Sequence, residues 1–343
     1  MENKKILIIG GTGALGKTLI KRYINNNQIM VLSRDEHKHV NLEKEYNSIS
    51  NLTFKIGDVK DINSIRNAVE DYKPHIVINT AALKHVPICE HNPYESVNVN
   101  ILGHQNLIQS IKRSNHRIET LMFISTDKAC APINVYGMCK AISERLYIDY
   151  AEQQKEIKVC LVRYGNVLES TGSVIPYFKK LLKEKVDKLP ITDMRMTRFL
   201  LTLDRACDLI DFAYDREDTH GCICIPKVKS FTIPSIAKAL IKWYNLSYNS
   251  KCEGLKEIGI RPGEKLHEAM ISEIEWMRTI DVGNNYLITN KIQTTQSKSY
   301  NSLDALMPDE EVYEFLKTCT QTHAMIVTVG MVFPGLTHCN KKV

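Results

Sequence analysis

The chain has 343 residues, of which 43% are hydrophobic and 24% are charged, enough for one large domain that carries a smaller one. Its 45 Lys and Arg residues slightly exceed its 39 Asp and Glu residues, so the formal net charge is +6. A charge this small and dispersed argues against a nucleic-acid partner and suits an anionic small molecule.

Cysteine usage and hydropathy indicate a cytoplasmic protein. The 10 cysteines are scattered, with no CxxC pair and no ligand-like spacing to histidines, so we expect reduced thiols and no metal site. Residues 1–5 are not followed by an apolar stretch of signal-peptide length, and the apolar segment 324–336 is too short to span a membrane. We therefore expect no membrane partner.

A glycine-rich loop follows the first predicted strand. Residues 4–9 are a continuous apolar run typical of a buried parallel strand, and residues 17–23 are amphipathic. At such a strand-to-helix turn, missing side chains let backbone N–H groups and the helix N-terminus approach a pyrophosphate. We expect this loop to bind a dinucleotide through Gly10, Thr12, Gly13, Ala14, Leu15 and Gly16.

The end of the second predicted strand, residues 28–32, bears on the choice of dinucleotide. Ser33, Arg34 and Lys38 follow it and favour the 2′-phosphate of NADP. Asp35 could instead accept from a ribose 2′-hydroxyl if it turned inward, so NAD stays possible.

Strands and helices continue to alternate along the chain. An Asp61-capped helix over 61–72 and a long helix over 93–113 separate apolar strands, which predicts a doubly wound parallel sheet with ligands at the carboxyl ends of its strands. The further strands are expected at 52–56, 75–80, 120–125 and 158–163, and further cofactor contacts at Asp58, Val59, Ala81, Ala82, Lys84 and Val167.

The stretch 125–140, STDKACAPINVYGMCK, carries proton-moving groups. Tyr136 and Lys140 are four residues apart in a predicted helix over 134–153, so both side chains lie on one face. A neighbouring ammonium lowers the pKa of a phenol, which would make Tyr136 a base near neutral pH. Thr126, at the end of the fifth strand, would assist it.

These features resemble the extended short-chain dehydrogenase/reductase family of nucleotide-sugar enzymes over about residues 4–290. The resemblance is most specific to its inverting UDP-N-acetylglucosamine 4,6-dehydratases. It implies a Rossmann domain, mainly NADP-binding, in 1–165, an interleaved UDP-sugar subdomain in 166–290, and a homo-oligomer, dimer or higher. The motifs that carry it are AALKHVP (81–87), STDKA (125–129), PINVYGMCK (132–140), VRYGNV (162–167), MTRF (196–199) and RPGEKLHE (261–268).

The resemblance also implies a reaction. Tyr136, with Lys140 and Thr126, would take the 4-hydroxyl proton, and Lys128, if neutral, would remove the C5 proton. Asp127, if protonated, would donate to the departing 6-hydroxyl, and Tyr136 or Asp127 would return a proton to C5 from the opposite face. Asp127 and Lys128 are distinctive, because retaining dehydratases carry Asp-Glu there and epimerases carry neither group.

The substrate end is expected in the second half of the chain. By resemblance, Lys84, Asn166, Arg198, Arg261 and Glu264 should contact the UDP-sugar, since arginine forks suit phosphate oxygens. Residues 168–172 depart from the family pattern, so no arginine contact is expected there. Residues 291–343 form an extension of uncertain structure, with a helix expected at 309–318, and we recognise no motif in residues 320–343.

Two other readings of the sequence stay open. A retaining 4,6-dehydratase or a 4-epimerase would use the same fold. A catalytically silent NADP-binding scaffold would also have this fold, but such relatives usually lose the tyrosine or the lysine, and both Tyr136 and Lys140 are present.

Overall fold

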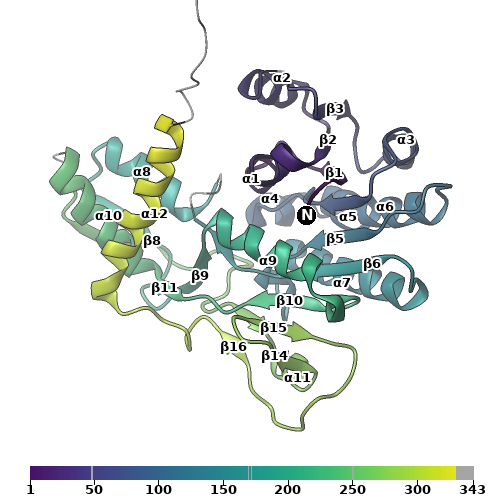
Figure 1. Ribbon diagram of the computed structural model, residues 1–343. Coiled ribbons are helices and arrows are strands. Elements are labelled where there is room, and N and C mark those ends of the chain that lie inside the picture. Colours follow the sequence, from purple (N-terminus) through teal and green to yellow (C-terminus); the bar gives the residue numbers. More distant parts are fainter. Residues whose placement is uncertain (48, 169, 171, 249–250, 330–343) are drawn as a thin grey trace, which may run out of the picture.

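A nine-stranded sheet forms the centre of the larger lobe in the computed structural model, which describes residues 1–47, 49–168, 170, 172–248 and 251–329 (Figure 1). Its order is β3-β2-β1-β4-β5-β6-β10-β15-β14, and all neighbours up to β10 are parallel. β15 is antiparallel to β10, and β14 to β15. The predicted parallel sheet is therefore confirmed, with a late antiparallel edge. The strands are β1 Lys5–Ile9, β2 Gln28–Ser33, β3 Leu52–Ile56, β4 Ile76–Asn79, β5 Thr120–Ile124, β6 Lys158–Val162, β10 Ile223–Pro226, β14 Thr279–Asp281 and β15 Asn285–Ile288.

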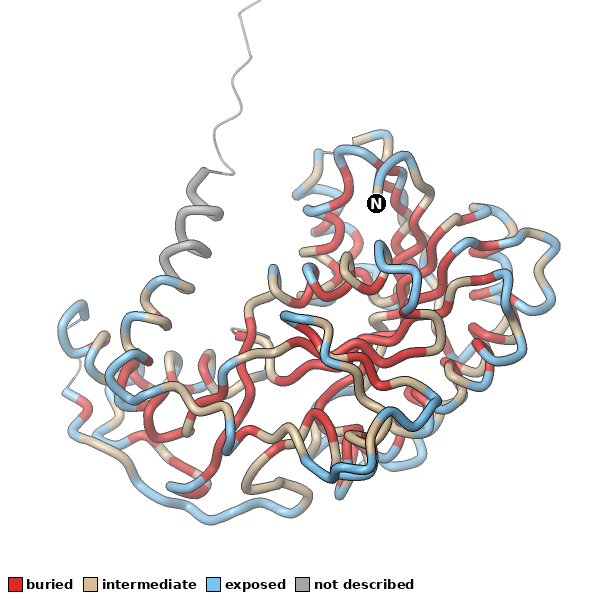
Figure 2. Tube along the Cα trace, turned by 60° about the horizontal axis from the view of Figure 1, so that its bottom comes forward, coloured by how far each residue is buried: buried red, intermediate tan, exposed pale blue. Residues whose placement is uncertain are grey.

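Helices cover both faces of this sheet because its strands are apolar on both sides. Ile6 and Ile8 pack with one set of helices, whereas Leu7 and Ile9 pack with the other, and all four side chains are buried. Figure 2 shows the buried strands enclosed between more exposed helices. The first face carries α1 Ala14–Tyr23, α2 Glu36–Glu45 and α9 Leu203–Asp215, and the second carries α3 Ile62–Tyr72, α6 Gly103–Lys112 and α7 Val135–Gln153.

The long helix predicted at 93–113 is interrupted, so that prediction was wrong in its middle. α5 Pro93–Val97 and α6 are joined by a wide π-helical turn, Asn98–Leu102. Asn100 in this turn binds the backbone N–H and C=O of Leu83, each at 2.8 Å, and its own carbonyl accepts from Ser143 on α7. The turn thus holds the segment after β4, which also contains an unpredicted short helix, α4 Val86–His91.

The smaller lobe has its own apolar core, built from residues after 165. α12 lies beside α10 and buries Val312 and Leu316 in that core (Figure 1). The helix predicted at 309–318 is present and continues to Val329, whereas residues 330–343 lie outside the described part of the chain. The elements are β7 Asn166–Val167, α8 Val174–Lys183, β8 Lys188–Ile191, β9 Thr197–Leu201, β11 Ser230–Thr232, α10 Ile233–Tyr248, β12 Gly254–Glu257 and α12 Asp309–Val329.

A short segment returns the chain from the smaller lobe to the main sheet. It contains the strand β13 Ala269–Ile271 and the helix α11 Glu273–Trp276. β13 pairs with β16 Tyr300–Asn301. Nine cysteines lie in the described residues, all as free thiols, and eight of them are buried. Within the same described residues, no helix has the length and apolarity to cross a membrane, and no group of side chains is arranged to hold a metal ion.

Candidate active site

A cavity of about 710 Å³ opens at the carboxyl ends of the parallel strands, between the two lobes. This volume lies in the range of small-molecule sites, and the edge of the sheet is where ligands of such folds bind. Every residue predicted above to touch cofactor or substrate lines it, as do Thr126, Lys128, Tyr136 and Lys140. Asp127 is the exception among the predicted residues: its side chain is fully buried beside Lys128.

The glycine loop is shaped for close approach of a diphosphate. Gly10 has φ +78°, and a Cβ at that position would lie 2.7 Å from the backbone N of Ala81. α1 begins after Gly13 with no side-chain cap and no acidic residue in its first turn. The first N–H groups of α1 therefore stay available to an anion, so the residues present fit a dinucleotide.

At the end of β2, the acidic side chain is used by its own helix. Asp35 caps α2 by accepting from the backbone N–H of Lys38 at 3.1 Å, and it pairs with Lys38 Nζ at 3.0 Å. Ser33 Oγ lies 3.2 Å from Thr12 Oγ1 and 2.5 Å from His39 Nε2. Arg34 lines the cavity next to these groups.

The start of α7 packs tightly against the turn that carries Lys128. Asn134 caps α7 by accepting from the N–H of Gly137 at 2.8 Å, and it donates to the carbonyl of Gly263 at 2.8 Å. A Cβ on Gly137 would lie 2.2 Å from the carbonyl oxygen of Lys128. Glycine at this position therefore lets the helix that holds Tyr136 contact the Lys128 turn.

Tyr136 and Lys140 are both buried, and their environments differ from the sequence-based prediction. Lys140 Nζ donates to the carbonyl of Ile124 at 2.5 Å and lies 4.2 Å from the Phe123 ring centre. Burial lowers the pKa of Lys140 to about 7, although the charge of Glu144 opposes this shift.

The predicted lowering of the Tyr136 pKa by Lys140 was wrong for this arrangement. Burial raises the pKa of Tyr136 to about 12, and the positive charge that opposes this rise is that of Lys128, helped by a hydrogen bond with Thr126. The positive charge that favours the phenolate of Tyr136 is therefore that of Lys128, from the turn after β5, and not that of Lys140 in its own helix.

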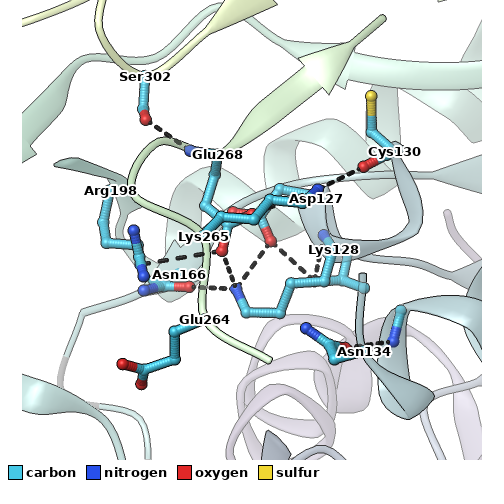
Figure 3. Close-up of polar contacts among 12 residues, drawn as sticks. Asp127, Lys128, Cys130, Asn134, Asn166, Arg198, Glu264, Lys265, Glu268 and Ser302 are labelled. Atoms are coloured by element: carbon cyan, nitrogen blue, oxygen red, sulfur yellow. Dashed lines mark hydrogen bonds and ion pairs between the residues drawn. The ribbon is translucent and has the colours of Figure 1, made fainter. Parts of the chain in front are cut away.

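Lys128 lies in a ring of three oxygens (Figure 3). Its Nζ donates to Asp127 Oδ1 and to Asn166 Oδ1, each at 3.1 Å, and lies 3.4 Å from Glu268 Oε1. Burial disfavours the charged amine, but the carboxylates of Asp127 and Glu268 hold the pKa of Lys128 above its ordinary value. The neutral Lys128 that the sequence-based mechanism requires is therefore not the resting form of this side chain.

Asp127 has the properties of a carboxyl group that can hold a proton. Burial raises its pKa, Lys128 opposes this effect and Glu268 adds to it. Thr126 Oγ1 donates to Asp127 Oδ1 at 3.0 Å, whereas Oδ2 is buried with no hydrogen-bond partner among the residues that the structure describes.

Glu268 is a member of the site that the sequence reasoning did not single out. It lies in the segment before β13, is only 2% exposed, and faces Arg198 Nε and Lys265 Nζ, each at 3.9 Å, in addition to Lys128. The signal was present in the sequence, because Glu268 is the last residue of the RPGEKLHE block.

The predicted substrate residues are partly occupied by contacts within the protein. Arg198 is buried and donates to the carbonyl groups of Thr197 and Leu266, at 2.7 and 3.2 Å. Arg261 is exposed and pairs with Glu264 at 2.6 Å. Asn166 contacts Lys128, so it links the predicted substrate residues to the predicted catalytic ones.

A second cluster of buried charges, Arg163, Glu144 and Glu275, joins elements that carry the site. Arg163, 1% exposed, binds Glu144 of α7 at 2.6 Å and Glu275 of α11 at 2.8 Å. Glu144 also accepts from Ser125 Oγ at 2.6 Å. The cluster joins α7, the end of β5 and α11, and sequence reasoning missed it because its members lie far apart along the chain.

Comparisons with known proteins identify the family of this chain. A UDP-N-acetylglucosamine 4,6-dehydratase (inverting) from Campylobacter jejuni is 41% identical over 313 residues, which cover 89% of this chain and 89% of that protein. A UDP-glucose 4-epimerase from Rickettsia bellii is 38% identical over 294 residues, 83% of each chain. The solved structure of Pen from Bacillus thuringiensis matches with a TM-score of 0.85 and 30% identity, over 93% of this chain and 98% of that one. The family described as polysaccharide biosynthesis protein matches residues 6–290, and the chain belongs to this family.

Proposed function

We propose that this protein is a lyase that dehydrates UDP-N-acetylglucosamine across C4 to C6 and inverts C5. The product would be UDP-2-acetamido-2,6-dideoxy-β-L-arabino-hex-4-ulose, used in deoxyamino-sugar and glycan synthesis. The observation that carries the proposal is the contact of Lys128 with Asp127 at the cavity that Tyr136 also lines. The 41% identity to an inverting dehydratase supports it.

We propose NADP as the cofactor, held by the glycine loop and the N-terminus of α1. Ser33, Arg34 and Lys38 suit a 2′-phosphate, and Asp35, the residue that would favour NAD, caps α2 instead. When bound, the nicotinamide would accept hydride from C4 and return it to C6, so no outside reductant is consumed.

In this proposal Tyr136 takes the proton of the 4-hydroxyl. Its raised pKa means that the phenolate needs positive charge nearby, which Lys128 supplies. Lys140 lines the same cavity. Oxidation at C4 makes the hydrogen on C5 acidic, which prepares the elimination.

The elimination is proposed to use the proton shared by Asp127 and Lys128. Transfer of a proton from Lys128 to Asp127 gives an amine that can remove the C5 proton and an acid that can protonate the 6-hydroxyl. After water leaves, Lys128 is again an ammonium and Asp127 a carboxylate. Tyr136 and Asp127 remain the two candidates for returning a proton to C5, and donation by Tyr136 would restore its starting state.

Incubation with UDP-N-acetylglucosamine in heavy water tests this function. NMR of the product should show a 4-keto-6-deoxy sugar of L-configuration with deuterium at C5. A product that keeps its 6-hydroxyl would support a 4-epimerase, and one that keeps the D-configuration would support a retaining dehydratase. No turnover at all would favour a silent scaffold, so each of these three outcomes overturns the proposal.

We also propose that the two segments of the chain bind different ligands. Residues 1–165 would mainly bind the dinucleotide and residues 166–290 mainly the UDP-sugar, although three strands of the main sheet, β10, β14 and β15, lie in the second segment. The reducing environment of the cytoplasm would suit the buried thiols.

We also propose that the protein is a homo-oligomer. Exposed apolar side chains lie on neighbouring elements, namely Ile88 on α4, Tyr94 on α5, Leu102 on the wide turn, and Met138 and Ile142 on α7. A second copy of the same surface would cover them. Light scattering of the full chain should give the mass of a dimer or a higher assembly, and a monomer at working concentration would contradict this.

A further inference from the structure

Glu268 occupies a fixed position between the two lobes. Its backbone N–H donates to Ser302 Oγ at 2.9 Å, and Ser302 Oγ lies 2.6 Å from Thr197 Oγ1 on β9. Its carboxylate faces Lys128 at 3.4 Å and Arg198 and Lys265 at 3.9 Å each (Figure 3). A buried carboxylate is costly unless it is paired, so these cations account for its presence in the interior.

An ammonium group has three N–H donors, and the surroundings of Lys128 offer three oxygens, from Asp127, Asn166 and Glu268. Asn166 cannot accept a proton from Lys128, whereas the two carboxylates can. Burial alone would raise the pKa of Glu268, but Lys128, Arg198 and Lys265 hold it below its usual value. Lys128 Nζ hydrogen-bonds to Asp127 Oδ1 at 3.1 Å, whereas Glu268 lies further away and also faces Arg198 and Lys265. We therefore assign Asp127 as the carboxylate that exchanges a proton with Lys128, and Glu268 as the one that stays ionised.

We propose that Glu268 is a positioning residue for the Asp127–Lys128 pair: it fixes the Lys128 ammonium as its third oxygen partner, and its permanent negative charge retains the proton that the pair shares. This inference rests on the proposed function for its catalytic meaning. Its physical basis is the geometry of the buried carboxylate.

The other charged and titratable groups around Lys128 do not supply the second negative charge that the pair needs. Asp127 and Lys128 come from the turn after β5, Tyr136 from α7, Arg198 from β9, and Lys265 from the 261–268 segment. Lys265 Nζ is directed to the carbonyl of Cys130, at 2.7 Å, and His267 Nδ1 to Thr197 Oγ1, at 2.8 Å. Glu268 is the negative group, other than Asp127 itself, that lies within ion-pair distance of Lys128 in the described residues.

Removal of this charge has a defined consequence for the pH profile. Glu268 raises the pKa of Asp127 and that of Lys128, because a nearby anion favours the protonated form of both. The two groups titrate as a coupled pair, so both limbs of the pH profile depend on the same anion. Glu268→Gln should therefore move both limbs in the same direction, to lower pH.

The test compares Glu268→Gln with Glu273→Gln, an exposed glutamate five residues further along the chain. We expect the profile of kcat for Glu268→Gln to move down by roughly one pH unit or more. kcat itself should fall by roughly ten- to hundred-fold, since Lys128 loses the negative charge of one of its ion-pair partners, while KM changes little. Glu273→Gln should match the wild type. An unshifted profile in a folded Glu268→Gln enzyme would overturn the inference.

A second measurement does not depend on turnover. In protein labelled with ¹³C at aspartate carboxyl groups, the resonance of Asp127, identified by its loss in Asp127→Asn, should titrate at lower pH in Glu268→Gln than in the wild type. Glu268→Asp keeps the negative charge but moves it away from Lys128, because the side chain is shorter. It should give an intermediate shift in the Asp127 titration, and it replaces the glutamine variant if that variant does not fold. An Asp127 titration that these changes leave in place contradicts the inference, whereas a wild-type enzyme that makes no 4-keto-6-deoxy product contradicts the proposed function alone.

Discussion

Two lysines line the same cavity, Lys128 and Lys140, and their pKa values are shifted in opposite directions. Lys140 faces a backbone carbonyl and an aromatic ring, and burial lowers its pKa to about 7. Lys128 faces two carboxylates, which hold its pKa above the ordinary value. Loss of solvent lowers the pKa of both amines. The groups that contact each amine therefore decide whether it is a cation at neutral pH.

The same contrast divides the site into two working parts. Tyr136 and Lys140 belong to one helix and serve the oxidation at C4 in the proposed reaction. Asp127, Lys128 and Glu268 come from two distant segments and serve the elimination. Single substitutions should separate these two parts, and the largest effects are expected at Lys128 and Tyr136.

Lys128→Ala should stop the elimination and leave the oxidation half partly intact, whereas Tyr136→Phe should stop both. Loss of a positioned acid or base costs roughly 10²- to 10⁴-fold in rate. With UDP-N-acetylglucosamine, Lys128→Ala should accumulate reduced nicotinamide without a 6-deoxy product, and Tyr136→Phe should show neither signal. The absorbance of the reduced cofactor and NMR of the sugar measure the two steps separately.

Tyr177→Phe, at a half-exposed position on α8, is the control for the tyrosine change and should behave as the wild type. Full turnover in Lys128→Ala would remove this side chain from the elimination. Equal loss of both signals in Lys128→Ala would mean that the two parts cannot be separated.

Lys140→Met should stabilise the protein, and the gain should depend on pH. The folded pKa of about 7 lies below the usual 10.5, so the folded chain binds fewer protons than the unfolded chain between these values. Wild-type stability from this group therefore rises by about 1.4 kcal/mol per pH unit across that window, and its penalty is greatest below pH 7. The advantage of Lys140→Met should be largest below pH 7 and should vanish towards pH 10.5.

Lys128→Met should change the stability in the opposite direction and serves as the comparison. It leaves Asp127 and Glu268 without their shared cation and should lower the free energy of unfolding near neutral pH by about 3–5 kcal/mol. Denaturant unfolding at pH 6 and pH 9 compares the two variants with the wild type. A Lys140→Met protein that is destabilised equally at both pH values would show that Lys140 is charged and well paired in the folded state.

Asn134→Ala should have the smallest effect, and it tests the link between α7 and the 261–264 turn. Loss of a helix cap costs about 1 kcal/mol, and loss of the bond to Gly263 should also raise KM for the UDP-sugar. Asp61→Ala is the matched control, because it removes the N-terminal cap of another helix, α3. The Asp61 side chain accepts from the Asn63 N–H at 2.9 Å. This variant should lower the thermal midpoint by a similar amount without changing KM, and an equal KM in both variants would argue against the link.

Local patterns made much of this molecule predictable. The glycine loop, the helix cap at Asp61 and the helix that bears Tyr136 and Lys140 depend on residues close together in sequence. The parallel sheet followed from the alternation of apolar runs. The motif-based resemblance agrees with the family match over residues 6–290.

Features that depend on distant contacts were not predictable in the same way. The interruption at Asn98–Leu102 is stabilised by bonds to Leu83 and to Ser143, which no helical pattern reveals. The raised pKa of Tyr136 follows from burial by the whole fold. Glu268 lies 140 residues after Lys128, so only the folded chain shows that it is the third partner of the amine.

The path of the chain through the main sheet limits how this protein can be engineered. The chain leaves the sheet after β6, builds part of the smaller lobe, returns as β10, and after another excursion adds β14 and β15 beside it. A fragment cut at residue 165 would therefore expose the edge of β6 and lose three strands. α12, which follows β15, belongs to the smaller lobe again. Exchange of that lobe with the lobe of a relative therefore needs junctions after β6, on each side of β10, before β14 and after β15, and the pairing of β10 with β6 and β15 must be kept.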